Sequence, residues 1–91
     1  MNRFTSGQLV ISKSGRDKGR MFLVQAVIDE QFVHLVDGKL RRLDKPKRKK
    51  IIHLQATHYH SDILLNPQVN DAGVWKTIQS YQRSEEDSEI G

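Results

Sequence analysis

The chain of 91 residues contains no cysteine, and none of its apolar runs approaches the roughly 20 residues of a membrane-spanning helix. Without cysteine, the chain forms no disulfide framework and offers no thiolate ligand for a metal. Its N-terminal residues lack the apolar core of a signal peptide. We therefore expect a cytoplasmic protein that makes no contact with a membrane.

Residue patterns that carry catalysis are also missing. No serine stands beside a general base at a meaningful spacing, and no glycine-rich phosphate-binding loop of the Walker type is present. A domain of this length rarely encloses a deep pocket. We expect a protein that is not an enzyme and has no cofactor.

Positive charge is concentrated in the first part of the chain. Residues 1–55 hold 13 Lys and Arg against five Asp and Glu, whereas residues 56–91 hold two against six. The net charge of +4 is therefore the difference between a basic module of +8 and an acidic segment of −4. A basic face of this kind indicates a partner that carries phosphate groups.

Short alternating runs of apolar residues predict five β-strands, over residues 9–11, 21–28, 31–36, 39–43 and 50–55. Apolar side chains occupy both faces of the second run, as in the wall of a small closed barrel that another element covers on one side. Asp37-Gly38 is typical of a two-residue type I′ hairpin turn. We expect a mainly β fold, a small five-stranded barrel.

A change to helical spacing follows the predicted barrel. Val74, Ile78 and Tyr81 would share one stripe of a helix over residues 71–82, with Asn70 or Asp71 as its N-cap. Residues 83–91 are acidic and hold few bulky apolar side chains, which predicts a disordered tail. We divide the chain into a flexible leader (1–6), a barrel (7–55), a C-terminal extension (56–82) and this tail.

The loop between the first two predicted strands carries two glycines and several cations. Gly15 and Gly19 would permit positive φ and a close approach of another backbone, and Asp17 would brace the turn through an Asx-type hydrogen bond. Phosphate groups suit the loop cations, since arginine grips phosphate with two hydrogen bonds and lysine acts as a point charge. The candidate contacts here are Lys13, Arg16, Lys18 and Arg20.

A second basic segment spans residues 39–50, where eight Lys and Arg face a single acid, Asp44. Pro46 would keep this segment extended and open, and each cation that reaches a phosphate backbone releases counterions. The candidate contacts are Arg41, Arg42, Lys45, Lys47, Arg48, Lys49 and Lys50. Two alternatives are a loop that is merely solvated and, over residues 45–50, a nuclear-localisation signal.

These segments together resemble a known motif. The pattern Gly7-x-x-Val10-x-Ser12-x-x-Gly15-x-x-Lys18-Gly19-x-x-x-x-Val24 resembles the KOW motif of ribosomal proteins and NusG-type transcription factors. With Val27-Ile28-Asp29 and Leu35-Val36-Asp37-Gly38, the chain also resembles the "fourteen-e" family of large-subunit ribosomal proteins and short bacterial KOW-domain proteins. The resemblance covers residues 7–55.

What this resemblance implies is an SH3-like barrel that packs on RNA. We expect an RNA-binding, ribosome-associated monomer that grips the RNA backbone, with ribosomal RNA as its partner and ribosomal or translation-factor proteins as further partners. The alternative is a protein-interaction module of the transcription or translation machinery. In both cases Gly15, Asp17, Gly19, Asp37 and Gly38 would shape the loop and the hairpin turn.

Histidine and aromatic side chains suggest further ligands only weakly. His53, His58 and His60 have Asp62 as their one nearby carboxylate, whereas a zinc site needs three or four fixed ligands. We expect these histidines to be exposed or to stack on RNA, and we expect no metal. Trp75 and Tyr81 are suited to stacking on bases, but at helical spacing they more often pack on the domain.

Overall fold

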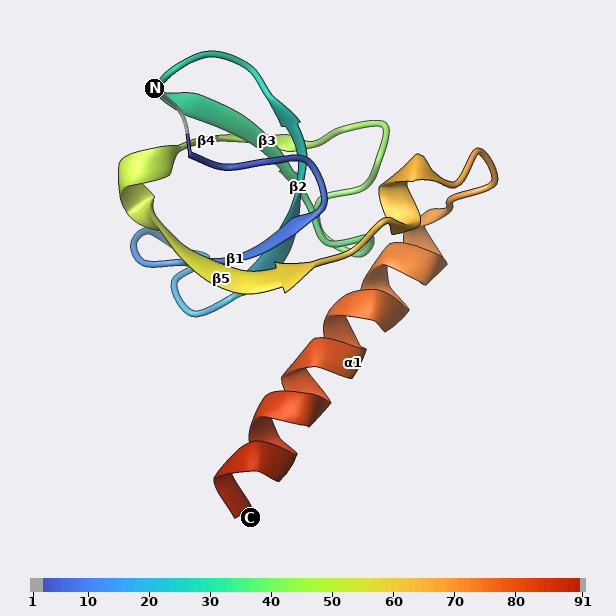
Figure 1. The fold of residues 1–91 in the computed structure, drawn as a ribbon. Coiled ribbons are helices and arrows are strands. Elements are labelled where there is room, and N and C mark those ends of the chain that lie inside the picture. The colour runs from blue at the N-terminus through green and yellow to red at the C-terminus, as the bar shows by residue number, and fades with distance from the viewer. Residues whose placement is uncertain (1–2, 91) are drawn as a thin grey trace.

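The computed structural model describes residues 3–90, with the side chains of residues 3–83 (Figure 1). Five antiparallel strands form one sheet, and one long helix follows them. The strands are β1 (Gln8–Ser12), β2 (Met21–Val27), β3 (Phe32–Val36), β4 (Lys47–Lys50) and β5 (Leu54–His60). The helices are α1 (Asp71–Ile90) and two single turns of 3-10 helix, η1 (Ile51–His53) and η2 (Ile63–Leu65).

The sheet has the strand order β4-β3-β2-β1-β5, so that β4 and β5 are its two edges. It curls strongly (Figure 1), but no pairing joins β4 to β5 in the described part of the chain. A mainly β fold of five strands with a C-terminal helix is therefore confirmed, whereas closure of the sheet into a barrel is not.

Both faces of the sheet bury apolar side chains, as the apolar pattern of residues 21–28 predicts. The cluster on the inside of the curl joins residues of β1, β2, β3 and β5 to the half-buried Ile51 of η1. Its buried members are Val10, Phe22, Val24, Val33, Leu35 and Leu54. On the other face, Leu9, Leu23 and Val36 pack against Val74 and Ile78 of α1. Burial of this kind contributes about 25 cal/mol per Å² of apolar area.

The helix α1 begins where its N-cap signal predicts. The Asn70 side-chain oxygen accepts a hydrogen bond from the Gly73 N–H at 2.8 Å, so Asn70 is the N-cap. Val74 and Ile78 are buried and Tyr81 is half-buried, which confirms the predicted stripe.

The expected disordered tail differs from the structure. The helix continues through residues 83–90, and only Gly91 of that tail lies outside the described residues. Glutamate is a good helix former, and extending an existing helix carries no nucleation cost. The second half of α1 runs away from the sheet (Figure 1).

Two of the predicted strands lie elsewhere in the chain. Residues 39–43 are not a strand but part of the long connection from β3 to β4, and the strand that pairs with β3 is Lys47–Lys50. The run predicted as the last strand, residues 50–55, contains η1 and only the first residues of β5. Local alternation could not show this, since β4 has no apolar residue and its pairing with β3 is a tertiary contact.

The N-terminal segment is attached to the sheet. Phe4 packs against the cluster inside the curl, and the Ser6 hydroxyl donates a hydrogen bond to the Gln25 carbonyl at 3.1 Å. Of the expected flexible leader, residues 1 and 2 lie outside the described residues, and the rest is held by these contacts. In the described range 3–90, no helix has the length and apolar character needed to cross a membrane.

Candidate functional site

The connection between β1 and β2, residues 13–20, is a compact loop that presents cations at its tip. Its base is closed by backbone hydrogen bonds between Ser12 and both Gly19 and Arg20, at 2.8 and 3.0 Å. Gly15 and Gly19 have φ values of +86° and +87°, which side chains other than glycine adopt only with strain. Lys13, Arg16, Lys18 and Arg20 are exposed around this loop.

Asp17 forms different hydrogen bonds from those that we expected. Its carboxylate does not brace the turn through an Asx-type bond but accepts hydrogen bonds from the Ser12 hydroxyl at 2.7 Å, Lys47 Nζ at 2.7 Å and Lys49 Nζ at 3.0 Å. The two lysines belong to β4, so this acid ties the loop to the far edge of the sheet. We call Asp17, Ser12, Lys47 and Lys49 the Asp17 clasp.

The clasp also fixes the charge of its carboxylate. Burial alone would raise the pKa of Asp17, but the hydrogen bonds from Lys47, Ser12 and Lys49 and the charge of Lys47 outweigh it, so the pKa lies well below its usual range. Asp17 is therefore ionised at neutral pH. Its negative charge offsets part of the charge of the two ammonium groups. One of these groups belongs to Lys49, a residue only 9% exposed.

Strand alternation divides the basic residues of β4 between two sides. Lys47 and Lys49 point toward Asp17. Arg48 and Lys50 point the other way and lie over the ring of Phe32, at 3.9 and 5.8 Å from its centroid. The last four residues of the second basic segment are thus an edge strand, and their four cations do not share one surface.

The connection from β3 to β4 is folded back on itself, without the expected type I′ hairpin. The Asp37 carboxylate accepts hydrogen bonds from the N–H groups of Lys39 and Arg41, at 2.9 and 2.8 Å. Gly38 has a φ of +80°. Asp37 and Gly38 therefore do shape a turn, as predicted, but the turn is a wider loop that places Leu40 and Arg41 at the surface.

The first turn of α1 holds this loop in place. Asp71 accepts a hydrogen bond from the Leu43 N–H at 2.8 Å and forms an ion pair with Arg42 at 3.4 Å. Lys39 Nζ lies 4.9 Å from the centroid of the Trp75 ring. Trp75 thus contacts the loop, and Tyr81 packs beside Tyr59 at 4.9 Å between ring centroids.

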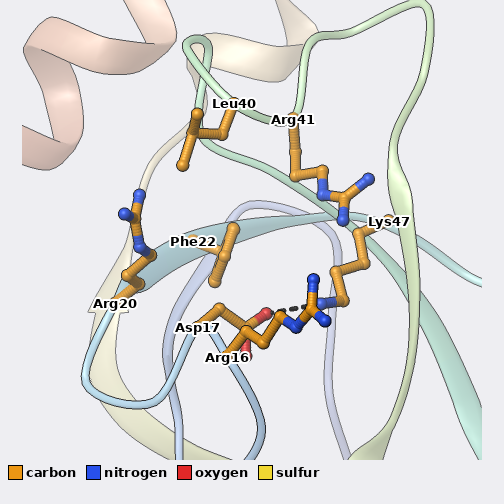
Figure 2. Close-up of a pocket in the computed structure, with 7 residues that line it drawn as sticks. All are labelled: Arg16, Asp17, Arg20, Phe22, Leu40, Arg41 and Lys47. Carbon is orange, nitrogen blue, oxygen red and sulfur yellow. Dashed lines mark hydrogen bonds and ion pairs between the residues drawn. The ribbon is translucent and has the colours of Figure 1, made fainter.

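The two basic segments meet around one open pocket of about 410 Å³ (Figure 2). Arg16 and Arg20 come from the β1–β2 loop, and Arg41 and Lys47 come from the second basic segment. The full lining is Arg16, Asp17, Arg20, Phe22, Leu40, Arg41 and Lys47. Four cations and one carboxylate give the lining a net charge of +3.

The arginines of this pocket are available to a ligand. Arg16, Arg20 and Arg41 are exposed, and among the described residues no acidic side chain forms an ion pair with any of them. The one carboxylate at the pocket, Asp17, is already engaged by two lysines. Three guanidinium groups that have no acidic partner among the described residues are chemically suited to bind an anion.

The other predicted contacts lie outside the pocket. Lys13, Lys18 and Lys45 are exposed but do not line it, and Arg42, Arg48, Lys49 and Lys50 have the contacts described above. Two lining residues were not predicted, Phe22 and Leu40. The signal for Leu40 was its position as an isolated leucine within a run of cations, and we had assigned it to a strand.

The histidines do not gather around a common point. His53 is in η1, His58 and His60 are on β5, and all three are exposed. In the part of the chain that the structure describes, no three His, Asp or Glu side chains are arranged to hold a metal ion.

The sequence matches no protein-family model and no curated protein. The geometry of the pocket and of the clasp is therefore the basis for a functional proposal.

Proposed function

We propose that this protein is a non-enzymatic RNA-binding protein of the KOW type, whose curled sheet is an SH3-like barrel and whose basic pocket contacts the RNA backbone. One observation carries the proposal: arginines from two separate segments converge on one open pocket that has no free acid among its lining residues. A phosphate chain suits such a concentration of positive charge, because each contact between a cation and a phosphate releases counterions and so favours binding.

The clasp supports this proposal through the position of the arginines. Arg16 is next to Asp17 in the chain, and Asp17 is bound to β4. The loop is therefore held against the sheet, and Arg16 and Arg20 lose less freedom when they bind a ligand than they would on a free hairpin tip. Ribosomal RNA, in a ribosome-associated role in the cytoplasm, is the RNA that the resemblance to ribosomal proteins favours.

The test is a charge reversal with a matched control. The variant Arg16→Glu/Arg41→Glu changes one pocket arginine from each segment, and Lys76→Glu/Arg83→Glu changes two exposed cations of α1 by the same charge. Each lost contact to a phosphate costs about 1.5 kcal/mol, or roughly tenfold in affinity. We expect the pocket variant to bind a fluorescein-labelled ribosomal RNA fragment about 100-fold more weakly, measured by anisotropy.

The control variant should retain affinity within about threefold, since neither of its side chains lines the pocket. Circular dichroism should show that both variants are folded. An equal loss of RNA affinity in the two variants would mean that net charge alone attracts RNA. If the wild-type protein does not bind the RNA, the pocket serves another partner, such as an acidic protein.

A further inference from the structure

The pocket contains an apolar part that contact with a phosphate backbone does not explain. Phe22 lies at its centre in Figure 2 and is only 2% exposed, so its ring forms a floor. Leu40 stands at the rim with 60% of its surface exposed, although it is a large apolar side chain between cations. The chain holds this leucine outward, because Asp37 and α1 fix the loop that carries it.

The polar part of the same pocket is suited to an anion such as a phosphate group. Arg16, Arg20 and Arg41 approach from both sides of Phe22 (Figure 2). Each guanidinium offers a planar fork of donors, and its flat face can also stack on an aromatic ring. A ligand that satisfies both parts therefore has a phosphate group joined to a flat, largely apolar ring.

On these grounds we propose that the pocket binds a single nucleotide whose base is unstacked from its neighbours, the phosphate on the arginines and the base against Leu40. The proposal rests on the proposed function, because it assigns the nucleotide to a strand of RNA. The pocket volume of about 410 Å³ lies within the range of small-ligand sites, about 300–1,000 Å³.

The chemistry of the lining also predicts the kind of RNA that binds. Bases in a duplex are stacked and paired, so their faces cannot reach Leu40, whereas bases of a single strand can. The lining residues include no Asn, Gln, Ser or Thr that could read the edge of a base. We therefore expect a preference for unpaired nucleotides with little preference among the four bases.

The experiment compares a fluorescein-labelled single-stranded 10-nucleotide RNA with a duplex of the same length. The variants are Leu40→Ala and, as a matched control, Leu65→Ala, which truncates another exposed leucine (79%) away from this pocket. We expect the wild type to bind the single strand about tenfold more tightly than the duplex. Leu40→Ala should lower single-strand affinity about fivefold without changing duplex affinity, and Leu65→Ala should change neither.

Other outcomes separate this proposal from the proposed function. If both RNAs bind equally and Leu40→Ala has no effect, while Arg16→Glu/Arg41→Glu still abolishes binding, the nucleotide pocket is overturned and RNA binding stands. If neither RNA binds, RNA binding is overturned, and uridine monophosphate is titrated against the backbone amide signals of Leu40 and Arg41. Shifts at both amides would support a pocket for a free nucleotide, and no shift would overturn it.

Discussion

At the scale of single residues, Asp17 has a larger role in the site than the local sequence predicted, because it connects the loop to β4. The sequence shows an acid between cations, from which we predicted a local turn-forming role. Its partners Lys47 and Lys49 are 30 and 32 residues away. Local chemistry identified the loop, its glycines and its arginines, but no local pattern indicates which of several lysines a buried carboxylate will bind.

The clasp predicts a specific loss of stability. Asp17→Ala leaves two ammonium groups close together without a counter-charge, one of them largely buried, and should lower the free energy of unfolding by about 3 kcal/mol at pH 7. Urea denaturation measures this change. Asp44→Ala, which removes an exposed acid, is the control and should cost less than about 0.5 kcal/mol.

The pH dependence of the stability of the wild type and of Asp17→Ala gives a second prediction. The native pKa of Asp17 lies below its unfolded value of about 3.9, so its stabilising contribution is complete above pH 4. As the pH falls below 4 toward the native pKa, that contribution is lost. The stability difference between wild type and Asp17→Ala should therefore shrink between pH 4 and pH 2.5. A difference that stays constant over this range would contradict the clasp.

At the scale of elements, tertiary packing gives the β3–β4 connection a different conformation from the tight hairpin that its sequence predicts. Asp37-Gly38 predicts a tight hairpin, and Gly38 does adopt positive φ. However, Gly38 packs on the first turn of α1, and the chain continues for several more residues before β4 begins. Residues 39–43 therefore form a loop that packs on α1, where we had expected a returning strand. The same packing places Leu40 and Arg41 at the pocket.

A comparison of two glycines tests this docking. A methyl group on Gly38 would overlap the Asp71 carbonyl oxygen and lie 2.9 Å from the backbone nitrogen of Trp75. A methyl group on Gly19 would have no atom within 4 Å. Both glycines have positive φ, so Gly19→Ala should cost about 1 kcal/mol from the backbone alone. Gly38→Ala should cost about 3 kcal/mol in thermal denaturation. Equal costs would show that the loop does not need its contact with α1.

Other elements followed their patterns closely. β1, β2 and β3 and the start of α1 lie where alternation, helical spacing and the N-cap predict them. β4 was missed because Lys47-Arg48-Lys49-Lys50 has no apolar face to signal a strand. Its inward lysines are accommodated only because Asp17 meets them.

At the scale of the whole molecule, the sequence correctly indicated a sheet with two apolar faces, one of them covered by another element. In the structure that element is α1. The sequence could not indicate how far the sheet curls, and the structure leaves β4 and β5 unpaired with each other. The charge division of the chain has a spatial form as well. Most Lys and Arg residues belong to the sheet and its connecting loops. The second half of α1 extends away from the sheet (Figure 1).

The central claim is that the basic pocket and its surroundings bind an RNA backbone. Its most direct test is the affinity of the wild-type protein for a single-stranded RNA, measured by anisotropy from 50 to 300 mM KCl. With about five phosphate contacts, a plot of log affinity against log salt should have a slope of about −3 to −4. A slope near zero, or no RNA binding at 50 mM KCl, would contradict the claim.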